Sequence, residues 1–356
     1  MFVSFRLSRK FIIIFLIIFL SATMLTSMVR SFSVKTAKAD LPQPATSNES
    51  KAKKNYIKWV DFGITADAMQ AALKLDIASQ STKAPIDWIE LLAILGAKYG
   101  GDFNRFKSAD LSALAKRITD GETIADITRD MKYYPYYIEA YRAVLSEFAG
   151  EYQIQTFDEN NKPVWETKYG LKAFAPIAKN YGYSHYNDFG ASRSYGYKRK
   201  HLGHDMLGSV GTPIIAIESG IVEAIGWNQY GGWRIGIRSF DRKRYYYYAH
   251  LRKNHPYPQD LSIGHTVKAG DVIGYLGMTG YSSKENVNNI DTPHLHWGLQ
   301  LIFDESQKEG NNEIWIDCYE ISQFLAKNTS EVIKDESTNE YRRKYDFFEK
   351  SVENTE

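Results

Sequence analysis

The chain has 356 residues, more than one average domain holds, so two folded units and a leader are expected. Apolar residues make up 44% and charged residues 24%, as in ordinary globular proteins, and the net charge of +2 gives no reason to expect a nucleic-acid partner. The single cysteine, Cys318, excludes an internal disulfide and a zinc site built from several cysteines.

The first residues indicate a membrane-directed segment. Arg6, Arg9 and Lys10 precede an apolar run over residues 11–29, which is long enough to span a bilayer as one helix. Ala39 closes a small-x-small site of the kind that signal peptidase cuts, so a cleaved signal peptide and an uncleaved anchor both fit residues 1–39. The long gap before Ala39, which contains cations, favours the anchor. Either interpretation places the rest of the chain outside the cytoplasm, at the membrane or cell wall.

A helical domain is predicted over residues 56–150, after a polar linker at 40–55. The expected helices cover residues 66–79 behind a Thr65 cap, 85–98, 110–118, and 124–148 with an interruption at Pro135. The region contains no histidine, and Glu90 faintly suggests the acid of a glycan hydrolase, without a second carboxylate set. We therefore expect this domain to position or gate the chemistry, or to dock an envelope protein, and to be dispensable for hydrolysis.

From about residue 168, short β-type runs alternate with Gly and Pro turns. Strands are expected over residues 212–219, 221–227, 233–240, 244–251, 272–276 and 294–301. This pattern predicts an antiparallel β domain of the barrel or sandwich type over residues 183–330, after a connector at 151–182. Residues 312–326 are expected to close it with a strand and a helix, and residues 331–356 to form a charged, mobile tail. The predicted fold class is therefore α+β.

All eight histidines lie in the second half of the chain, and three motifs place the chemistry there. In TPHLHWGL, His294 and His296 flank one leucine and so point to the same face of a strand. His201 and Asp205 are four residues apart, again an even spacing, and His250 ends another strand. His201, Asp205 and one histidine of the HLH pair supply the three ligands that catalytic zinc needs. The other HLH histidine and His250 would accept a proton from water and steady negative charge. Spacing alone leaves open which histidine of the pair binds metal.

These motifs resemble those of the lysostaphin-type, LytM-like zinc metallopeptidases, which cut peptide cross-links in bacterial peptidoglycan. The matching stretches are HLGHD at 201–205, YAHL at 248–251 and HLH at 294–296, in the family's order and within a matching glycine framework. The resemblance covers residues 183–325 and implies the duplicated hybrid motif fold. It also implies Zn²⁺ bound by His201, Asp205 and His296, with His250 and His294 as catalytic histidines, and peptidoglycan peptides as partners. Two loops, at 254–263 and 284–291, are longer than in many members, so substrate preference does not carry over.

Two further interpretations stay open: a LytM-like binding or regulatory module without catalysis, and a structural metal site. All five family positions are present, which favours the enzyme. His204, His255 and His265 are expected to be structural or solvated, and His185 is ambiguous. The candidates for substrate contact, each weighed against packing or a surface role, are Arg193, Tyr195, Tyr197 and alternate members of the tyrosine run at 245–248.

Overall fold

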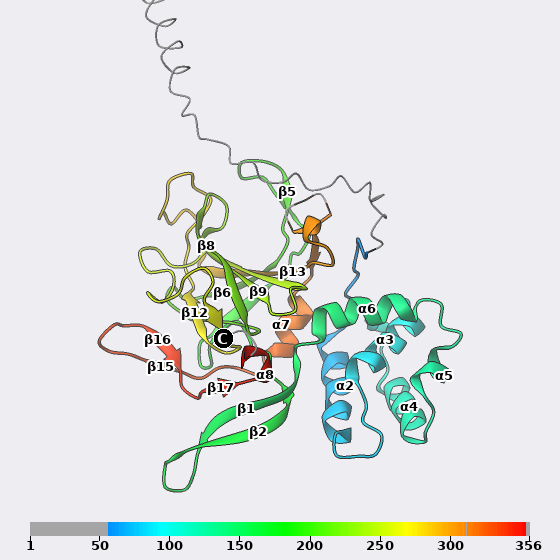
Figure 1. Ribbon diagram of the computed structural model, residues 1–356. Coiled ribbons are helices and arrows are strands. Elements are labelled where there is room, and N and C mark those ends of the chain that lie inside the picture. Colours follow the sequence, from blue (N-terminus) through cyan, green and yellow to red (C-terminus); the bar gives the residue numbers. More distant parts are fainter. Residues whose placement is uncertain (1–55, 309, 311, 354–356) are drawn as a thin grey trace, which may run out of the picture. The chain divides into compact units, whose positions relative to one another are not determined.

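Capping residues set where the first helices of the computed structural model begin (Figure 1). The structure describes residues 56–308, 310 and 312–353. Helix α2 (Ala66–Ser79) follows Thr65, whose hydroxyl accepts from the Ala68 amide, and α3 (Trp88–Tyr99) follows Asp87, whose carboxylate accepts from two amides. Gly100 ends α3 with a φ of 67°. Helix α2 has the predicted bounds, and α3 begins three residues later than predicted.

The rest of the helical region contains three more helices, α4 (Ser108–Thr119), α5 (Ile124–Thr128) and α6 (Tyr134–Leu145). The interruption predicted within residues 124–148 is confirmed, although it falls before Pro135. That proline lies in the first turn of α6, where its missing N–H costs no helical hydrogen bond.

The predicted membrane segment and linker, residues 1–55, lie outside the described residues. Within the described part, none of the helices combines the length and the apolar character needed to cross a bilayer.

A hairpin occupies most of the stretch that was predicted to be a connector. Strands β1 (Ala149–Phe157) and β2 (Pro163–Leu171) pair antiparallel along their whole length. Most residues of β2 are exposed, so the hairpin lacks the apolar alternation by which a half-buried strand is recognised. That is why the sequence pattern missed it.

The main sheet is antiparallel and runs in the order β11-β8-β9-β10-β13-β6-β3, with β14 paired to the second half of β13. Its strands are β3 (Tyr183–Tyr186), β6 (His204–Gly208), β8 (Gly220–Asn228), β9 (Gly232–Ser239), β10 (Arg244–Ala249), β11 (Thr266–Val267), β13 (His294–Leu301) and β14 (Ile314–Ile316). Two-stranded pairs join β7 (Pro213–Ile215) to β12 (Val272–Tyr275), and β4 (Ser192–Arg193) to β5 (Arg199–Lys200). The first and last strands of the main sheet do not pair, so of the predicted barrel or sandwich the closed barrel is wrong for the described residues, whereas the α+β class and the antiparallel sheet are confirmed.

The two faces of the main sheet differ in character. One face carries fully buried side chains such as Tyr246, Tyr248 and Trp297, and the indole of Trp297 donates to Ser322 on α7 (Tyr319–Leu325). The residues between them in sequence point the other way. Because side chains alternate, His294 and His296 lie together on this second face.

The helical region shares its core with the β region. The chain from Asn55 onward forms one compact unit, and buried residues of α2, α3 and α6 belong to the same apolar cluster as those of β10 and β13. Trp88 stacks on Phe324 of α7, with ring centroids 5.8 Å apart. The Ala66 amide donates to Glu320 over 2.7 Å, and Arg244 of β10 donates to the Ala143 carbonyl over 2.9 Å.

The C-terminal stretch, predicted to be a charged, mobile tail, contains paired strands and a packed side chain within residues 332–348. Strands β15 (Val332–Lys334) and β16 (Tyr341–Arg343) pair with each other, and β17 (Phe347–Phe348) adds to β1 before a short helix, α8 (Lys350–Glu353). Phe347 is only 1% exposed and stacks on Tyr152. The charged residues around it concealed this apolar anchor.

Candidate metal centre and active site

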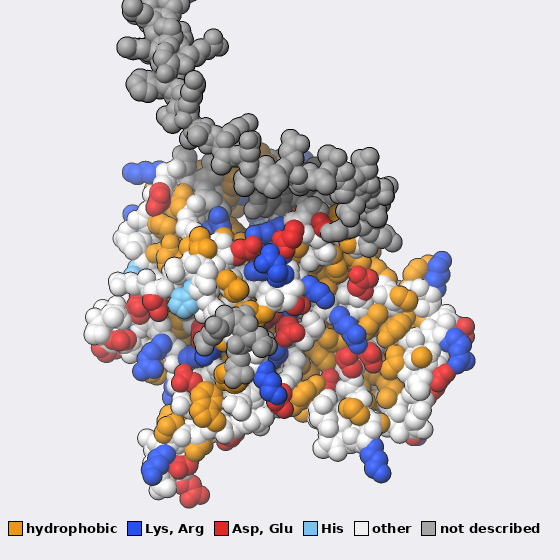
Figure 2. All heavy atoms as spheres, viewed as in Figure 1, with side chains coloured by type: hydrophobic (Ala, Val, Ile, Leu, Met, Phe, Trp, Pro, Cys, Tyr) orange, Lys and Arg blue, Asp and Glu red, His pale blue; other side chains and the backbone are white. Residues whose placement is uncertain are grey.

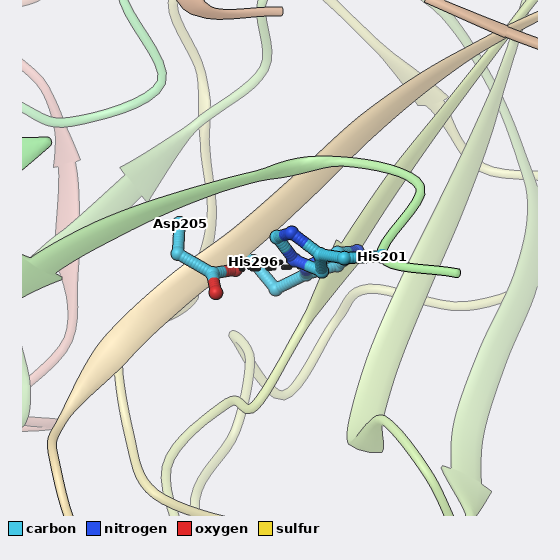
Figure 3. A group of neighbouring side chains, drawn as sticks. All are labelled: His201, Asp205 and His296. Carbon is cyan, nitrogen blue, oxygen red and sulfur yellow. Dashed lines mark hydrogen bonds and ion pairs between the residues drawn. The ribbon is translucent and has the colours of Figure 1, made fainter. Parts of the chain in front are cut away.

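Three ligand-type atoms converge where β6 meets β13 (Figure 3). His201 Nε2 lies 2.8 Å from His296 Nδ1 and 3.1 Å from Asp205 Oδ1, and His296 Nδ1 lies 2.9 Å from the same oxygen. Among the described residues, these three side chains form the group whose spacing suits a metal ion. Acceptor atoms held this close repel one another unless a proton or a cation lies between them.

Strand register brings the three residues together. In the antiparallel β6–β13 pair, Asp205 is directly opposite His296, and His201 reaches back from the segment before β6. Gly203 permits this approach, because a Cβ atom there would lie 2.5 Å from His296 Cε1 and 2.7 Å from the Trp297 carbonyl oxygen. The structure therefore brings together all three predicted metal-binding residues.

A second carboxylate, which the sequence reasoning missed, lies behind His201. Asp188 Oδ1 is 2.7 Å from His201 Nδ1, at an angle outside that of a regular hydrogen bond. A carboxylate on the rear nitrogen holds an imidazole so that its other nitrogen faces a metal. Arg193 pairs with Asp188 at 2.5 Å and lies 3.7 Å from Asp205, so its strongest contact is internal. The only sequence signal for Asp188 is its place just before the Gly190 turn.

His250 and His294 lie beside this cluster, as predicted. Their ring centroids are 4.7 Å apart, and His250 is 5.8 Å from His296. His294 Nε2 is 3.9 Å from Asp205 Oδ1. His250 Nδ1 donates to the Thr279 carbonyl over 2.9 Å, and His294 Nδ1 donates to the Thr292 carbonyl over 2.8 Å. Each backbone carbonyl therefore fixes a tautomer in which Nε2 is left as the acceptor.

The backbone at His250 is in the left-handed region, with a φ of 62°. A non-glycine residue adopts this conformation at a cost of order 1–3 kcal/mol, and such residues concentrate at functional sites. The conformation is held by the His250 amide, which donates to the Gly231 carbonyl over 2.7 Å.

Burial and mutual hydrogen bonds set the charges of the site. Burial raises the pKa of Asp205, but its bonds to His201 and His296 outweigh burial and hold that pKa well below its usual range. Burial lowers the pKa of His296, and burial followed by the nearby His294 lowers the pKa of His250 well below its usual value. These shifts favour an ionised Asp205 and neutral His296 and His250, which are the forms that bind metal and accept protons.

The remaining histidines lie outside the cluster. His204 is buried and bonds His185 over 2.7 Å, and burial lowers its pKa to about 4, so both act in packing against Tyr319. His265 is exposed, as expected. His255 is only half-buried rather than solvated, because it stacks on Tyr275 and lies near Glu340.

The five predicted site residues line one cleft of about 560 Å³ on the open face of the main sheet. Tyr245 and Tyr247 also line it, whereas their neighbours Tyr246 and Tyr248 are core residues, as the alternation predicted. Tyr197 lines the cleft, and Tyr195, which is 38% exposed, stacks on Tyr281 at its edge.

No described residue between 56 and 150 lines the cleft. The predicted role of the helical region as a cover over the site therefore has no structural support, and the region contacts α7 and the start of β10 instead. Over the face shown in Figure 2, acidic and basic side chains are interspersed, in keeping with the small net charge.

A family model for peptidase family M23 matches residues 199–309, the stretch that contains all five site residues. The chain carries an M23 peptidase domain. The domain is similar to the L-Ala–D-Glu endopeptidase of Bacillus subtilis, with 37% identity over 130 residues, covering 36% of this chain and 38% of that protein. It is also 39% identical over 98 residues to the glycyl-glycine endopeptidase ALE-1 of Staphylococcus capitis, covering 27% of this chain and 24% of that one.

The fold has a solved counterpart that extends beyond the M23 domain. A structure from Ruminococcus gnavus, named as a glycyl-glycine endopeptidase lytM, aligns with 77% of this chain and 92% of its own, at a TM-score of 0.50 and 19% identity. The aligned share is more than twice the share covered by the sequence match to the Bacillus subtilis protein. Within the curated relatives described above, the M23 domain and its flanks span well under half of each protein's length.

Proposed function

We propose that this protein is a zinc-dependent endopeptidase that hydrolyses peptide bonds of bacterial peptidoglycan outside the cytoplasm. The observation that carries the proposal is the cluster of His201, Asp205 and His296, flanked by His250 and His294 in one cleft of an M23 domain. Both curated relatives described above are named as endopeptidases.

The three side chains fit zinc. A tetrahedral zinc with bonds of about 2.0–2.2 Å keeps its ligand atoms roughly 3.3–3.6 Å apart. The observed separations of 2.8–3.1 Å need to widen by only a few tenths of an ångström. Two neutral imidazoles and one carboxylate are a ligand set that leaves a fourth position open, and zinc bound there would polarise a peptide carbonyl and acidify water.

The chain's own groups supply the proton transfers. The Nε2 atoms of His250 and His294 are the free acceptors, because each Nδ1 is already bonded to a backbone carbonyl. We assign one to accept the proton of the attacking water and the other, once protonated, to stabilise the oxyanion or pass a proton to the leaving amine. Tyr195 and Tyr197 at the cleft edge are assigned to substrate contact.

The position of the site also suits an extended peptide. The cleft lies on the open face of the sheet, over β9, β10 and β13, so a peptide can lie across the floor while its backbone reaches the metal cluster. The apolar run at residues 11–29 is proposed to anchor the chain in the membrane, so that the M23 domain faces the cell wall. The helical region is proposed to support the domain and to offer a surface for an envelope partner.

A binding module without catalysis is the second candidate. It is disfavoured because the two non-ligand histidines are both present and each has an Nε2 atom left as an acceptor, which binding alone does not require.

The test is digestion of purified peptidoglycan by the zinc-loaded chain, with new amino termini counted by chemical labelling. The metal-loaded chain and a His265→Ala control, which alters an exposed histidine outside the cleft, should both release amino termini. Activity should disappear with a chelator and return with zinc. Zinc binding without any release of amino termini would refute the enzyme and favour the binding module.

A further inference from the structure

The cleft floor contains an arginine in line with the metal cluster. Arg234 is on β9, whose register with β10 pairs Ile235 with Tyr248. This pairing ends there, with Arg234 next to Ile235 on β9 and Ala249 next to Tyr248 on β10, and Ala249 is paired in turn with His296. Neighbouring strands lie about 4.8 Å apart and β10 lies between β9 and β13, so Arg234 is two strand spacings, roughly 10 Å, from His296 across the sheet. All three residues line the same cleft.

Arg234 differs from the other arginines of this sheet in having no partner. Arg238 pairs with Glu305 at 2.7 Å, and Arg244 pairs with Glu218 at 2.8 Å. Arg234 makes no hydrogen bond or ion pair with any residue that the structure describes, although its side chain is half-buried and its Nε atom is fully buried. A buried polar atom without an acceptor is costly, and the half-buried side chain stays open to the cleft, so a ligand in the cleft can supply that acceptor.

Between Arg234 and the metal cluster, Ala249 and Tyr247 line the cleft. Ala249 contributes only a methyl group there, and Tyr247 stands beside it. A residue of an extended peptide advances by about 3.3 Å, so a substrate residue next to the bond at the metal cluster can reach Arg234 with its side chain. Five lysines and arginines line the cleft against three carboxylates, one of which is the metal-site Asp205.

We propose that Arg234 is a specificity-determining residue that binds a free carboxylate on the substrate, carried by a residue close to the scissile bond. This inference rests on the proposed function and narrows it: the cleft takes acidic peptides in preference to uncharged glycyl chains. A planar guanidinium binds a carboxylate through two parallel hydrogen bonds, and no other described floor residue offers that fork unpaired.

Binding of three soluble peptides tests this subsite separately from catalysis. The probes are the blocked peptides Ala-Glu-Lys-Ala and Ala-Gln-Lys-Ala, which differ in one charge, and blocked tetraglycine. Calorimetry is performed on zinc-loaded full chains that carry His294→Ala to prevent turnover. We expect the glutamate peptide to bind at least about tenfold more tightly than the glutamine peptide, and tetraglycine to bind weakest.

Substitutions at Arg234 then assign the preference. Arg234→Gln should abolish the difference between the glutamate and glutamine peptides without changing zinc content, and Arg234→Lys should retain part of it. Arg242→Gln is the matched control, since Arg242 is an exposed arginine on the turn after β9 that pairs with Glu305 outside the cleft. Equal affinities in the parent chain, or a preference that survives Arg234→Gln, would overturn the proposal. A preference lost as expected, in a chain that releases no amino termini from peptidoglycan, would uphold the subsite and refute the enzyme.

Discussion

The buried ion pair between Arg244 and Glu218 should make a large contribution to the stability of the folded unit. Arg244 is fully buried at the start of β10, where it donates to both oxygens of Glu218, over 2.8 and 3.0 Å. It also reaches Asp241 at 3.1 Å and donates to the Ala143 carbonyl of α6 over 2.9 Å. One side chain thus joins the sheet to the helical region.

Arg244→Met removes the positive charge and leaves the Glu218 carboxylate and the Ala143 carbonyl buried without it. Loss of one partner of a buried pair costs about 3–5 kcal/mol. At roughly 2–4 °C per kcal/mol for a chain of this size, the midpoint of thermal unfolding should fall by about 6–20 °C.

The assay is urea and thermal unfolding followed by circular dichroism, with Arg242→Gln as the control. Arg242 is exposed and pairs with Glu305 at 3.1 Å, so its loss should cost less than about 1 kcal/mol. The double variant Arg244→Met with Glu218→Leu should recover much of the loss, because no charge is then left buried alone. A loss below about 1 kcal/mol in Arg244→Met, or a double variant as unstable as the single one, would refute this reasoning.

Three further outcomes follow from the packing. Gly203→Ala should lower zinc affinity at least about tenfold, because its Cβ would lie 2.5 Å from His296 Cε1, whereas Gly182→Ala, with nothing within 4 Å, should leave affinity unchanged in a zinc titration. Deletion of residues 56–148 should give an insoluble or unfolded product in place of an active β domain, since the two regions share one apolar core; a soluble, zinc-binding product would contradict this. Lys172 bridges two glutamates that raise its pKa against the opposing effect of burial, so it stabilises the fold fully below pH 10.5 and loses this effect as pH rises further. Compared with Lys172→Met, the native chain should therefore lose stability more steeply in unfolding titrations above pH 10.5.

The grouping of the candidate site residues could be predicted from the sequence because short strands preserve spacing, whereas the separate roles of His294 and His296 came from the family resemblance and stay a prediction. Even separations along an extended chain put His294 and His296 on one face, and the paired strands then set Asp205 opposite His296. Sequence spacing could not reveal Asp188 or Arg234. Asp188 contacts His201 from a turn that lies outside the three motifs. Arg234 stands out only because its side chain has no hydrogen-bond partner among the residues that the structure describes, which spacing cannot show.

The fold was predicted less completely, for reasons of burial. Helices α2 and α3 were found because capping residues mark their beginnings and apolar residues recur along them. The β1–β2 hairpin was missed because its exposed residues carry no apolar alternation. The C-terminal strands were missed because a single buried anchor, Phe347, stands among charged residues. The choice between barrel and sandwich could not be made from the sequence, because strand pairing, which decides closure, is a long-range property that local patterns do not contain.

The measurement that tests the central claim most directly is zinc content per chain, read beside the release of amino termini from peptidoglycan, for the parent chain and two HLH variants. The account predicts about one zinc per parent chain, loss of both zinc and activity in His296→Ala, and retained zinc with activity reduced by roughly 10²-fold or more in His294→Ala. The structure supports this division because His296 Nδ1 lies 2.8 Å from His201 Nε2, whereas His294 Nε2 stays 3.9 Å from Asp205. Full zinc content in His296→Ala would contradict the assignment. So would a loss of zinc in His294→Ala, if His296→Ala kept its zinc.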